Sequence, residues 1–189
     1  MTRLYLFNRV LNEEDIFLPE EIIMHSNSYK IKEKRLISLS NYAYLAKELT
    51  KLGLSINSLG FINDKPIIPG IYLSVSHTDS LFGFIISNKE IGLDIEALIP
   101  EKRLNLANKI LSTIEYQEFI NSSNKALYLT NKWTLKEAYS KYLGTGLSDD
   151  IFSKEIKGLN LEIEGKLIGI YGDIDKLEIY LNNDEIKRI

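Results

Sequence analysis

Short runs rich in apolar and β-branched residues recur along the chain and predict β-strands, and the first of them also alternates apolar and polar positions. The first run is RLYLFN, residues 3–8. Three more runs follow one another with turn residues between them: 71–77, 81–87 and 90–96. Their close spacing predicts an antiparallel meander. Further strands are expected in the tail, near 155–163, 166–171 and 176–182.

Two longer stretches carry apolar residues at intervals of three and four, which is the spacing of one helix face. The first spans residues 33–51 and stops before Gly53. The second runs from about 124 to 143 and is followed by Gly144. Glycine is common just after the last turn of a helix, because it adopts the left-handed conformation without strain. The sequence therefore predicts two long helices.

One or two short helices are expected between them, over residues 102–120. The second begins near Ser112 or Thr113, which are good N-cap residues. Glu115 then falls in its first turn, where a carboxylate interacts favourably with the helix dipole.

The order of the elements is strand, helix, strands, and then helices and strands again. One long helix and one small sheet fall in each half of the chain. We therefore expect an α+β fold with two similar lobes, each a small, mostly antiparallel sheet packed with a long helix. The lobes would span about 1–96 and 97–189 of a single compact unit, 1–189, since no linker rich in Pro, Gly or Ser separates them.

The composition narrows the possible chemistry. The 189 residues carry a net charge of −3. Nucleic-acid-binding proteins normally show a clear excess of basic residues, so this charge gives no sign of such a function. The chain has no cysteine and only two histidines. This excludes a disulfide framework, a zinc–thiolate site and a cysteine nucleophile. Any metal would be held mainly by oxygen, which points to Mg²⁺, Mn²⁺ or Ca²⁺.

The sequence contains no run of about 18 apolar residues that would span a membrane. Its N-terminus becomes acidic too soon for a signal peptide. We expect a soluble, cytoplasmic, monomeric protein without a membrane segment.

The strand IGLDIE, residues 91–96, carries two acids that share one face. Neighbouring side chains of a strand point to opposite faces, so its three aliphatic residues face the core and Gly92, Asp94 and Glu96 face away. The two carboxylates are then about 7 Å apart, which suits two sides of one hydrated Mg²⁺. Gly92 would let a ligand approach the backbone. The alternative is a pair of solvated acids on an exposed face.

The only tryptophan lies in the second long helix, in a charged stripe. Trp133, Glu137 and Lys141 follow at i, i+4 and i+8, opposite an apolar face made of Leu135, Ala138, Tyr139 and Tyr142. Glu137 and Lys141 alone are typical of a surface ion pair worth about 0.2–0.5 kcal/mol. An indole one turn before that pair favours a site that needs an apolar plane, a carboxylate and an ammonium together.

Possible phosphate-binding groups lie in the first half of the chain. Ser76 and His77 end a predicted strand, where they could hold phosphate oxygens or only bond to a turn. Lysines bind phosphate as point charges, or are simply solvated. The candidates are Lys65 and the basic group Lys30, Lys32, Lys34 and Arg35. The sequence contains no Walker-type loop and no G-x-S-x-G.

Together these motifs resemble the 4′-phosphopantetheinyl transferases, of the monomeric, two-lobed type that activates peptide synthetases. The family shows Ser-His at a strand end, then G-x-D-x-E, then W-x-x-K-E-[AS]-x-x-K and a G-x-G-L turn. The chain has SH at 76–77, GLDIE at 92–96, WTLKEAYSK at 133–141 and GTGL at 144–147. The resemblance covers roughly residues 30–150. The family commonly has Gly-Lys-Pro where this chain has Asp64-Lys65-Pro66.

The resemblance implies transfer of the phosphopantetheine arm of coenzyme A to a serine of an acyl or peptidyl carrier protein, with adenosine 3′,5′-bisphosphate as by-product. Asp94, Glu96 and Glu137 would hold Mg²⁺ on the pyrophosphate. Glu137, directly or through a bound water, would take the serine proton. Lys141 would bind the coenzyme A pyrophosphate and neutralise charge on the leaving group.

The resemblance also implies residues that bind coenzyme A: Lys34, Arg35, Lys65, Ser76 and His77. Lys30 is a further candidate for the 3′-phosphate. Trp133 and Lys136 would shape the wall beside Glu137.

Two alternative functions remain open. One is a protein that binds coenzyme A or a carrier protein without turnover. The other is a different magnesium-dependent phosphate enzyme on the same carboxylates, such as a pyrophosphohydrolase. Recruitment of a carrier would fall to the 98–125 region, whose Leu104, Leu106, Ile110 and Leu111 either meet a partner helix or cover a core; we expect the core role.

Overall fold

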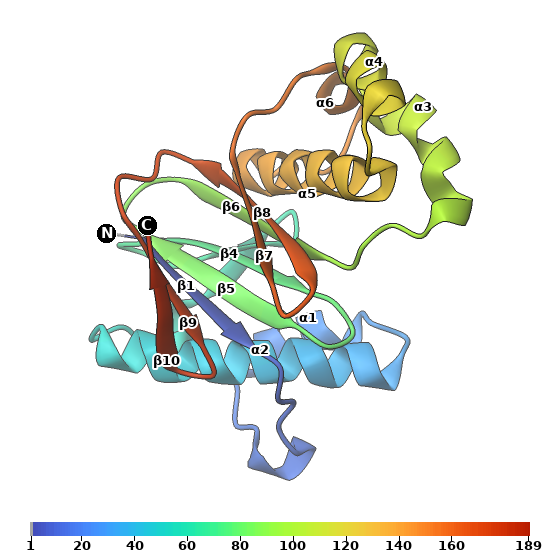
Figure 1. Ribbon diagram of the computed structural model, residues 1–189. Coiled ribbons are helices and arrows are strands. Elements are labelled where there is room, and N and C mark those ends of the chain that lie inside the picture. The colour runs from blue at the N-terminus through green and yellow to red at the C-terminus, as the bar shows by residue number, and fades with distance from the viewer. Residues whose placement is uncertain (1) are drawn as a thin grey trace. The chain divides into compact units, whose positions relative to one another are not determined.

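The computed structural model describes residues 2–189 and has a mixed α+β fold with several sheets (Figure 1). The chain divides into two compact units. The first contains the chain up to Lys89 together with Ile174–Ile189, and the second contains Glu90–Asp173. These units differ from the expected lobes, 1–96 and 97–189, because the pairing of the strands does not follow their order in the sequence.

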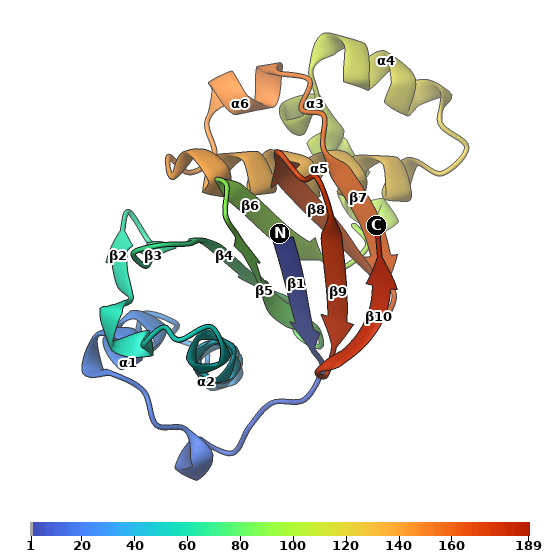
Figure 2. The same cartoon turned by 90° about the vertical axis from the view of Figure 1, so that its left-hand side faces the viewer.

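The first unit is built on a five-stranded sheet with the order β10-β9-β1-β5-β4 (Figure 2). Its strands are β1 (Thr2–Phe7), β4 (Tyr72–His77), β5 (Phe82–Ser87), β9 (Leu177–Leu181) and β10 (Asp184–Arg188). The central strand β1 pairs parallel with β9 and antiparallel with β5. The pairing of β1 with β9 brings the last strands of the sequence into the first unit.

Two helices accompany this sheet: α1 (Glu20–Asn27) and α2 (Lys32–Lys51). The longer helix α2 packs against β4 and β5, and its fully buried Leu45 and Leu49 join the core of the unit. In the same core the ring of Phe7 from β1 stacks on Tyr44 of α2 at 3.9 Å between centroids. The helix ends before Gly53, which has the left-handed φ of 73° expected of a helix terminator.

A two-stranded hairpin and two short 3₁₀ turns complete the first unit. The turns are η1 (Glu13–Asp15) and η2 (Ile56–Ser58), and the hairpin pairs β2 (Gly60–Ile62) with β3 (Lys65–Ile67). Asn63 and Asp64 form its two-residue loop with positive φ angles of 48° and 61°. Asn and Asp tolerate this conformation better than other side chains, which explains how the chain turns here without glycine.

The second unit contains a three-stranded antiparallel sheet with the order β6-β8-β7. The strands are β6 (Ile91–Glu96), β7 (Leu159–Ile163) and β8 (Lys166–Gly172). The long helix α5 (Lys125–Leu143) packs along β6 and β8 (Figure 1). It ends at Gly144, which has a left-handed φ of 69°.

Two glycines allow α5 to lie close to this sheet. A Cβ atom on Gly92 of β6 would lie 1.9 Å from the carbonyl oxygen of Ala138, and one on Gly169 of β8 would lie 2.5 Å from the carbonyl carbon of Thr134. The expectation that Gly92 leaves space for a ligand is therefore wrong, since the backbone of α5 fills that space.

The remaining helices form a second layer of the same unit: η3 (Glu101–Leu106), α3 (Ala107–Ile110), α4 (Thr113–Asn121) and α6 (Asp149–Ser153). Ser112 caps α4, and its side chain and that of Glu115 exchange hydrogen bonds with each other's backbone N–H in a capping box. Ile110 and Leu111 are buried in a core cluster, against which Leu104 and Leu106 pack. The expected core role of these four residues is confirmed.

The sequence located most elements correctly. Both long helices and the strands at 3–8, 71–77, 81–87 and 90–96 are present. The meander is wrong in its last step: β4 pairs with β5, but β6 pairs with β8 in another sheet. The pattern of apolar and polar residues indicates that a segment is a strand, but it does not identify the strand with which it pairs. Helices α1 and α6, the β2–β3 hairpin and β10 were not expected. No helix within residues 2–189 is both long and apolar enough to cross a bilayer.

Candidate active site

Asp94 and Lys141 form an ion pair inside the second unit. Lys141 Nζ lies 2.7 Å from Asp94 Oδ1. Asp94 is 4% exposed and comes from β6, whereas Lys141 comes from the last turn of α5. The strand face that carries Gly92 and Asp94 faces α5, because Gly92 on that face meets the helix backbone. The packing of α5 on β6 thus joins the two motifs that the sequence singled out.

Glu96, two residues further along β6, is bound by the only tryptophan of the chain. Trp133 Nε1 donates a hydrogen bond of 3.2 Å to Glu96 Oε1. Burial raises the pKa of the Glu96 carboxyl, as does the charge of Asp94, while the hydrogen bond from Trp133 acts in the opposite direction. The expected pairing of an indole with the acids is therefore present, with the indole as a hydrogen-bond donor as well as an apolar surface.

Glu137 is the third acid of this region. It is half-buried on α5, and its pKa is raised to about 7, first by burial and then by the negative charge of Asp94. Lys141 lowers this pKa and Glu96 raises it further. The three carboxylates are thus close enough to influence one another. A carboxyl group with a pKa near 7 can exchange a proton at physiological pH.

The chemistry of this donor set suits Mg²⁺, which prefers oxygen ligands and often uses one or two carboxylates together with substrate phosphates. Burial is the main cause of the raised pKa of Glu137, and the charges of Asp94 and Glu96 add to it; a divalent cation would offset these two charges. Within residues 2–189, however, no three Asp, Glu, His or Cys side chains are gathered closely enough to hold a metal ion. Asp94 is instead paired with Lys141.

A pocket opens beside Glu96 and Trp133. Its volume is about 260 Å³. It is lined by Ile99, Leu106, Ile110, Trp133, Phe152, Glu96, Arg103 and Lys109. The wall is thus largely apolar, with one acid and two cations at its polar positions. The Phe152 ring lies 6.3 Å from that of Trp133 with an interplanar angle of 19°.

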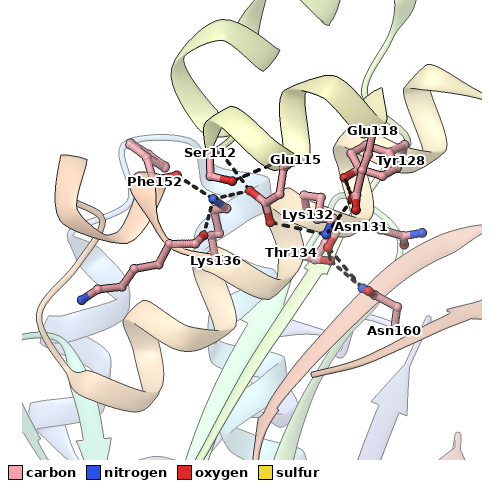
Figure 3. Close-up of polar contacts among 11 residues, drawn as sticks. Ser112, Glu115, Glu118, Tyr128, Asn131, Lys132, Thr134, Lys136, Phe152 and Asn160 are labelled. Atoms are coloured by element: carbon pink, nitrogen blue, oxygen red, sulfur yellow. Dashed lines mark hydrogen bonds and ion pairs between the residues drawn. The ribbon is translucent and has the colours of Figure 1, made fainter. Parts of the chain in front are cut away.

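Lys136 is a feature that the sequence did not reveal (Figure 3). Its side chain is fully buried and forms an ion pair of 2.7 Å with the equally buried Glu115. That it shapes the wall beside Glu137 by supporting it stays a prediction. One feature of the sequence could have indicated that Lys136 is buried. Lys136 lies seven residues after the buried Leu129, so both lie on the same side of α5.

Apart from Lys141, which lies in the second unit, the expected coenzyme A residues belong to the first unit. Ser76 is buried in β4, and His77 ends that strand half-buried, with its ring edge-on to Tyr29 at 5.3 Å. Lys65 begins β3, directly after the left-handed Asp64.

Lys34 and Arg35 lie in the first turn of α2. Lys34 is exposed, while the Arg35 guanidinium forms an ion pair of 3.0 Å with Glu13. Lys30 precedes the helix and is exposed. The first unit therefore presents basic groups at the start of α2, as the sequence suggested.

Comparison with known proteins agrees with this arrangement of motifs. Residues 90–182 match the family model described as the 4′-phosphopantetheinyl transferase superfamily. The chain is 30% identical over 104 residues to a holo-[acyl-carrier-protein] synthase of Ruthia magnifica, covering 52% of this chain and 80% of that protein. It is 32% identical over 92 residues to the corresponding synthase of Lactococcus lactis, covering 47% and 71%. The chain belongs to the 4′-phosphopantetheinyl transferase superfamily.

Other relatives are longer than the matched region. A 4′-phosphopantetheinyl transferase of Bacillus pumilus is 30% identical over 91 residues, which are 46% of this chain and 39% of that protein. The chain thus spans less than half of the length of this relative.

Proposed function

We propose that this protein transfers the 4′-phosphopantetheine group of coenzyme A to a serine of an acyl or peptidyl carrier protein. Membership of the superfamily supports this, as do relatives named holo-[acyl-carrier-protein] synthase. The observation that carries the proposal is the packing of α5 on β6, which pairs Lys141 with Asp94 and Trp133 with Glu96. The half-buried Glu137 lies on the same helix, within electrostatic reach of both strand acids.

In this proposal Asp94, Glu96 and Glu137 hold Mg²⁺. The cation, when bound, neutralises charge on the pyrophosphate of coenzyme A. The serine oxygen attacks the phosphorus that carries the pantetheine arm, and the bond from that phosphorus to the bridging oxygen breaks. Adenosine 3′,5′-bisphosphate leaves with the bridging oxygen. Glu137 accepts the serine proton, directly or through a water molecule, which its pKa of about 7 favours.

Lys141 balances the negative charge of the leaving group. Its ammonium already lies against Asp94 at 2.7 Å, so it is held at the carboxylates where the pyrophosphate would bind. A positioned cation stabilises charge that develops in the transition state.

The pocket beside Glu96 is proposed to receive the pantetheine arm. Its volume of about 260 Å³ and largely apolar wall suit an uncharged chain. The phosphates of coenzyme A are assigned to basic and polar groups of the first unit: Lys34, Arg35, Lys65, Ser76 and His77. A monomeric state, a cytoplasmic location and a twofold relation between two similar lobes stay predictions.

The direct test incubates the protein with coenzyme A, Mg²⁺ and an apo carrier protein, followed by mass spectrometry of the carrier. A gain of one phosphopantetheine group on the carrier serine is expected. The panel contains a fatty-acid-type and a peptidyl-type carrier, because the pathway served is not encoded in the site. No gain on any carrier contradicts the proposal.

A second candidate is a protein that binds coenzyme A or a carrier without turnover. The Asp94–Lys141 ion pair favours it, since this pair engages an acid that transfer requires for the metal. Calorimetry decides between the two: tight binding of coenzyme A without transfer to any carrier selects the binding protein.

A further inference from the structure

Glu115 and Lys136 form a buried ion pair in the second unit (Figure 3). The side chains are 1% and 0% exposed. Lys136 Nζ lies 2.7 Å from Glu115 Oε2 and donates to the carbonyl oxygens of Phe152 at 2.7 Å and Lys154 at 2.8 Å. An ammonium has three donors, and all three are used.

Glu115 is fixed from two further sides. Its Oε2 accepts a hydrogen bond of 3.0 Å from the backbone N–H of Ser112, and its Oε1 lies 3.4 Å from Lys132 Nζ. The start of α4, the middle of α5 and the end of α6 are therefore joined at one point. A buried ion pair is often no more stabilising than apolar residues of the same volume, so stability alone does not explain it. Its distinctive property is that its hydrogen bonds hold the groups of α4, α5 and α6 in fixed orientations.

The hydrogen bond from Lys136 to α6 connects the ion pair with the candidate active site. Lys136 donates a hydrogen bond to the backbone carbonyl of Phe152. The Phe152 ring in turn stacks on Trp133, with 6.3 Å between the ring centroids. Trp133 in turn donates a hydrogen bond to Glu96. The chain of contacts therefore runs from the ion pair, through Phe152 and Trp133, to an acid proposed to hold Mg²⁺.

We infer that Glu115 and Lys136 are positioning residues, which act through Phe152 and Trp133 to hold the Glu96 carboxylate in place. They touch neither substrate nor metal. This inference rests on the proposed function for its effect on magnesium, but the positioning of Trp133 is testable without any activity.

The test uses two variants of the full chain. Lys136→Met alone would leave the Glu115 carboxylate buried without its main partner, so it is combined with Glu115→Gln. Glutamine at this position of a capping box still bonds to the N-cap backbone, which preserves the start of α4. The second variant, Phe152→Ala, keeps the backbone carbonyl and removes the ring that packs on Trp133.

Two measurements follow Trp133 and Glu96. Trp133 is the only tryptophan of the chain, so its fluorescence reports this site alone. Both variants are expected to show stronger acrylamide quenching and a shifted emission maximum. Both are also expected to need about 10-fold more Mg²⁺ for half-maximal transfer, the range found when an outer-shell partner is lost. The KM for coenzyme A should not change in the double variant, which replaces no residue that lines the pocket. Phe152→Ala removes part of the wall of the pocket proposed for the pantetheine arm, so a higher KM is expected for that variant.

Lys132→Met is the matched control. Lys132 lies one turn earlier on α5 and contacts the other oxygen of Glu115, but no hydrogen bond from it to Phe152 is present within residues 2–189. Its fluorescence and magnesium requirement should equal those of the unaltered protein.

Unchanged quenching and magnesium requirement in a folded double variant overturn the inference, as does an equal effect of Lys132→Met. Should the double variant fail to fold, Phe152→Ala decides: wild-type fluorescence in that variant overturns the inference. Should the unaltered protein transfer nothing, the proposed function fails, while the quenching experiment still tests the positioning of Trp133.

Discussion

Lys141 Nζ lies 2.7 Å from Asp94 Oδ1, so the last turn of α5 is tied to the middle of β6 by a partly buried ion pair. The two residues are 47 positions apart in the sequence. The same contact brings Glu137, one turn earlier on the helix, within electrostatic reach of both strand acids.

Glu137→Gln should separate chemistry from binding. Loss of the general base is expected to reduce kcat by about 10²-fold or more. Coenzyme A binding by calorimetry and the fold by circular dichroism should be retained, because the amide has the shape of the protonated acid. Glu162→Gln, at an exposed position of β7, is the control and should retain full activity. Near-normal turnover of Glu137→Gln would show that the assigned role is wrong.

The pKa of Glu137 predicts how the stability of the metal-free protein depends on pH. The pKa is about 7 in the folded state, against an ordinary value of 4.5 for a glutamate exposed to water. Between these values the folded state binds more protons than the unfolded state, so this group's contribution to stability is present at low pH and is lost as pH rises through 7. Above about pH 7, Glu137 is ionised in both states, so its contribution to the free energy of unfolding no longer changes with pH.

Melting curves in the presence of a chelator check this sign. The Tm of Glu137→Gln minus that of the unaltered protein should be near zero at about pH 4.5, grow with pH and level off above about 7. A difference that shrinks with rising pH would contradict the raised pKa.

Asp94→Ala should raise the magnesium requirement. The variant loses a proposed metal ligand, so the half-saturating concentration should rise by more than the roughly 10-fold expected from loss of an outer-shell partner. It also removes the partner of Lys141. Titration of transfer activity with Mg²⁺ measures the effect, and an unchanged half-saturation point would remove Asp94 from the proposed metal site.

His77→Ala should weaken coenzyme A binding without affecting chemistry. A lost hydrogen bond to a charged phosphate corresponds to roughly a 10- to 100-fold higher KM for coenzyme A. The kcat should be unchanged. The other histidine supplies the matched control, because His25 stacks on Phe61 at 4.0 Å and has no assigned role in binding. Equal KM effects from both alanine variants would argue for loss of structure rather than loss of a phosphate contact.

Gly92→Ala should destabilise the second unit. The added methyl would lie 1.9 Å from the carbonyl oxygen of Ala138, so α5 must move away from β6. Overpacking of this kind costs typically about 1–3 kcal/mol, occasionally more. Gly60→Ala is the control, since the nearest atom to its Cβ would be a side-chain oxygen at 3.7 Å. Urea unfolding measures both, and equal stabilities would contradict the close approach of α5.

Local patterns in the sequence were sufficient for most elements. The spacing of apolar residues located α2 and α5, and the glycines after them marked their ends, because these signals depend only on neighbouring residues. Ser112 and Glu115 likewise predicted the start of α4, where a capping box forms. The two motifs of the candidate site were visible for the same reason, since each lies within one strand or one helix.

Tertiary structure alone decided how these pieces meet. The pattern of β6 could not show that it pairs with β8 rather than β5, because hydrogen bonds of the strand backbone are the same for any partner. Helix periodicity could place Lys136 on the side of Leu129, but its partners, Glu115 and the carbonyls of Phe152 and Lys154, are brought to it only by the packing of α4 and α6. The sequence determined which side chains could do the chemistry, and the contacts between distant segments decided which of them lie together, because burial and partners depend on residues far away in the chain.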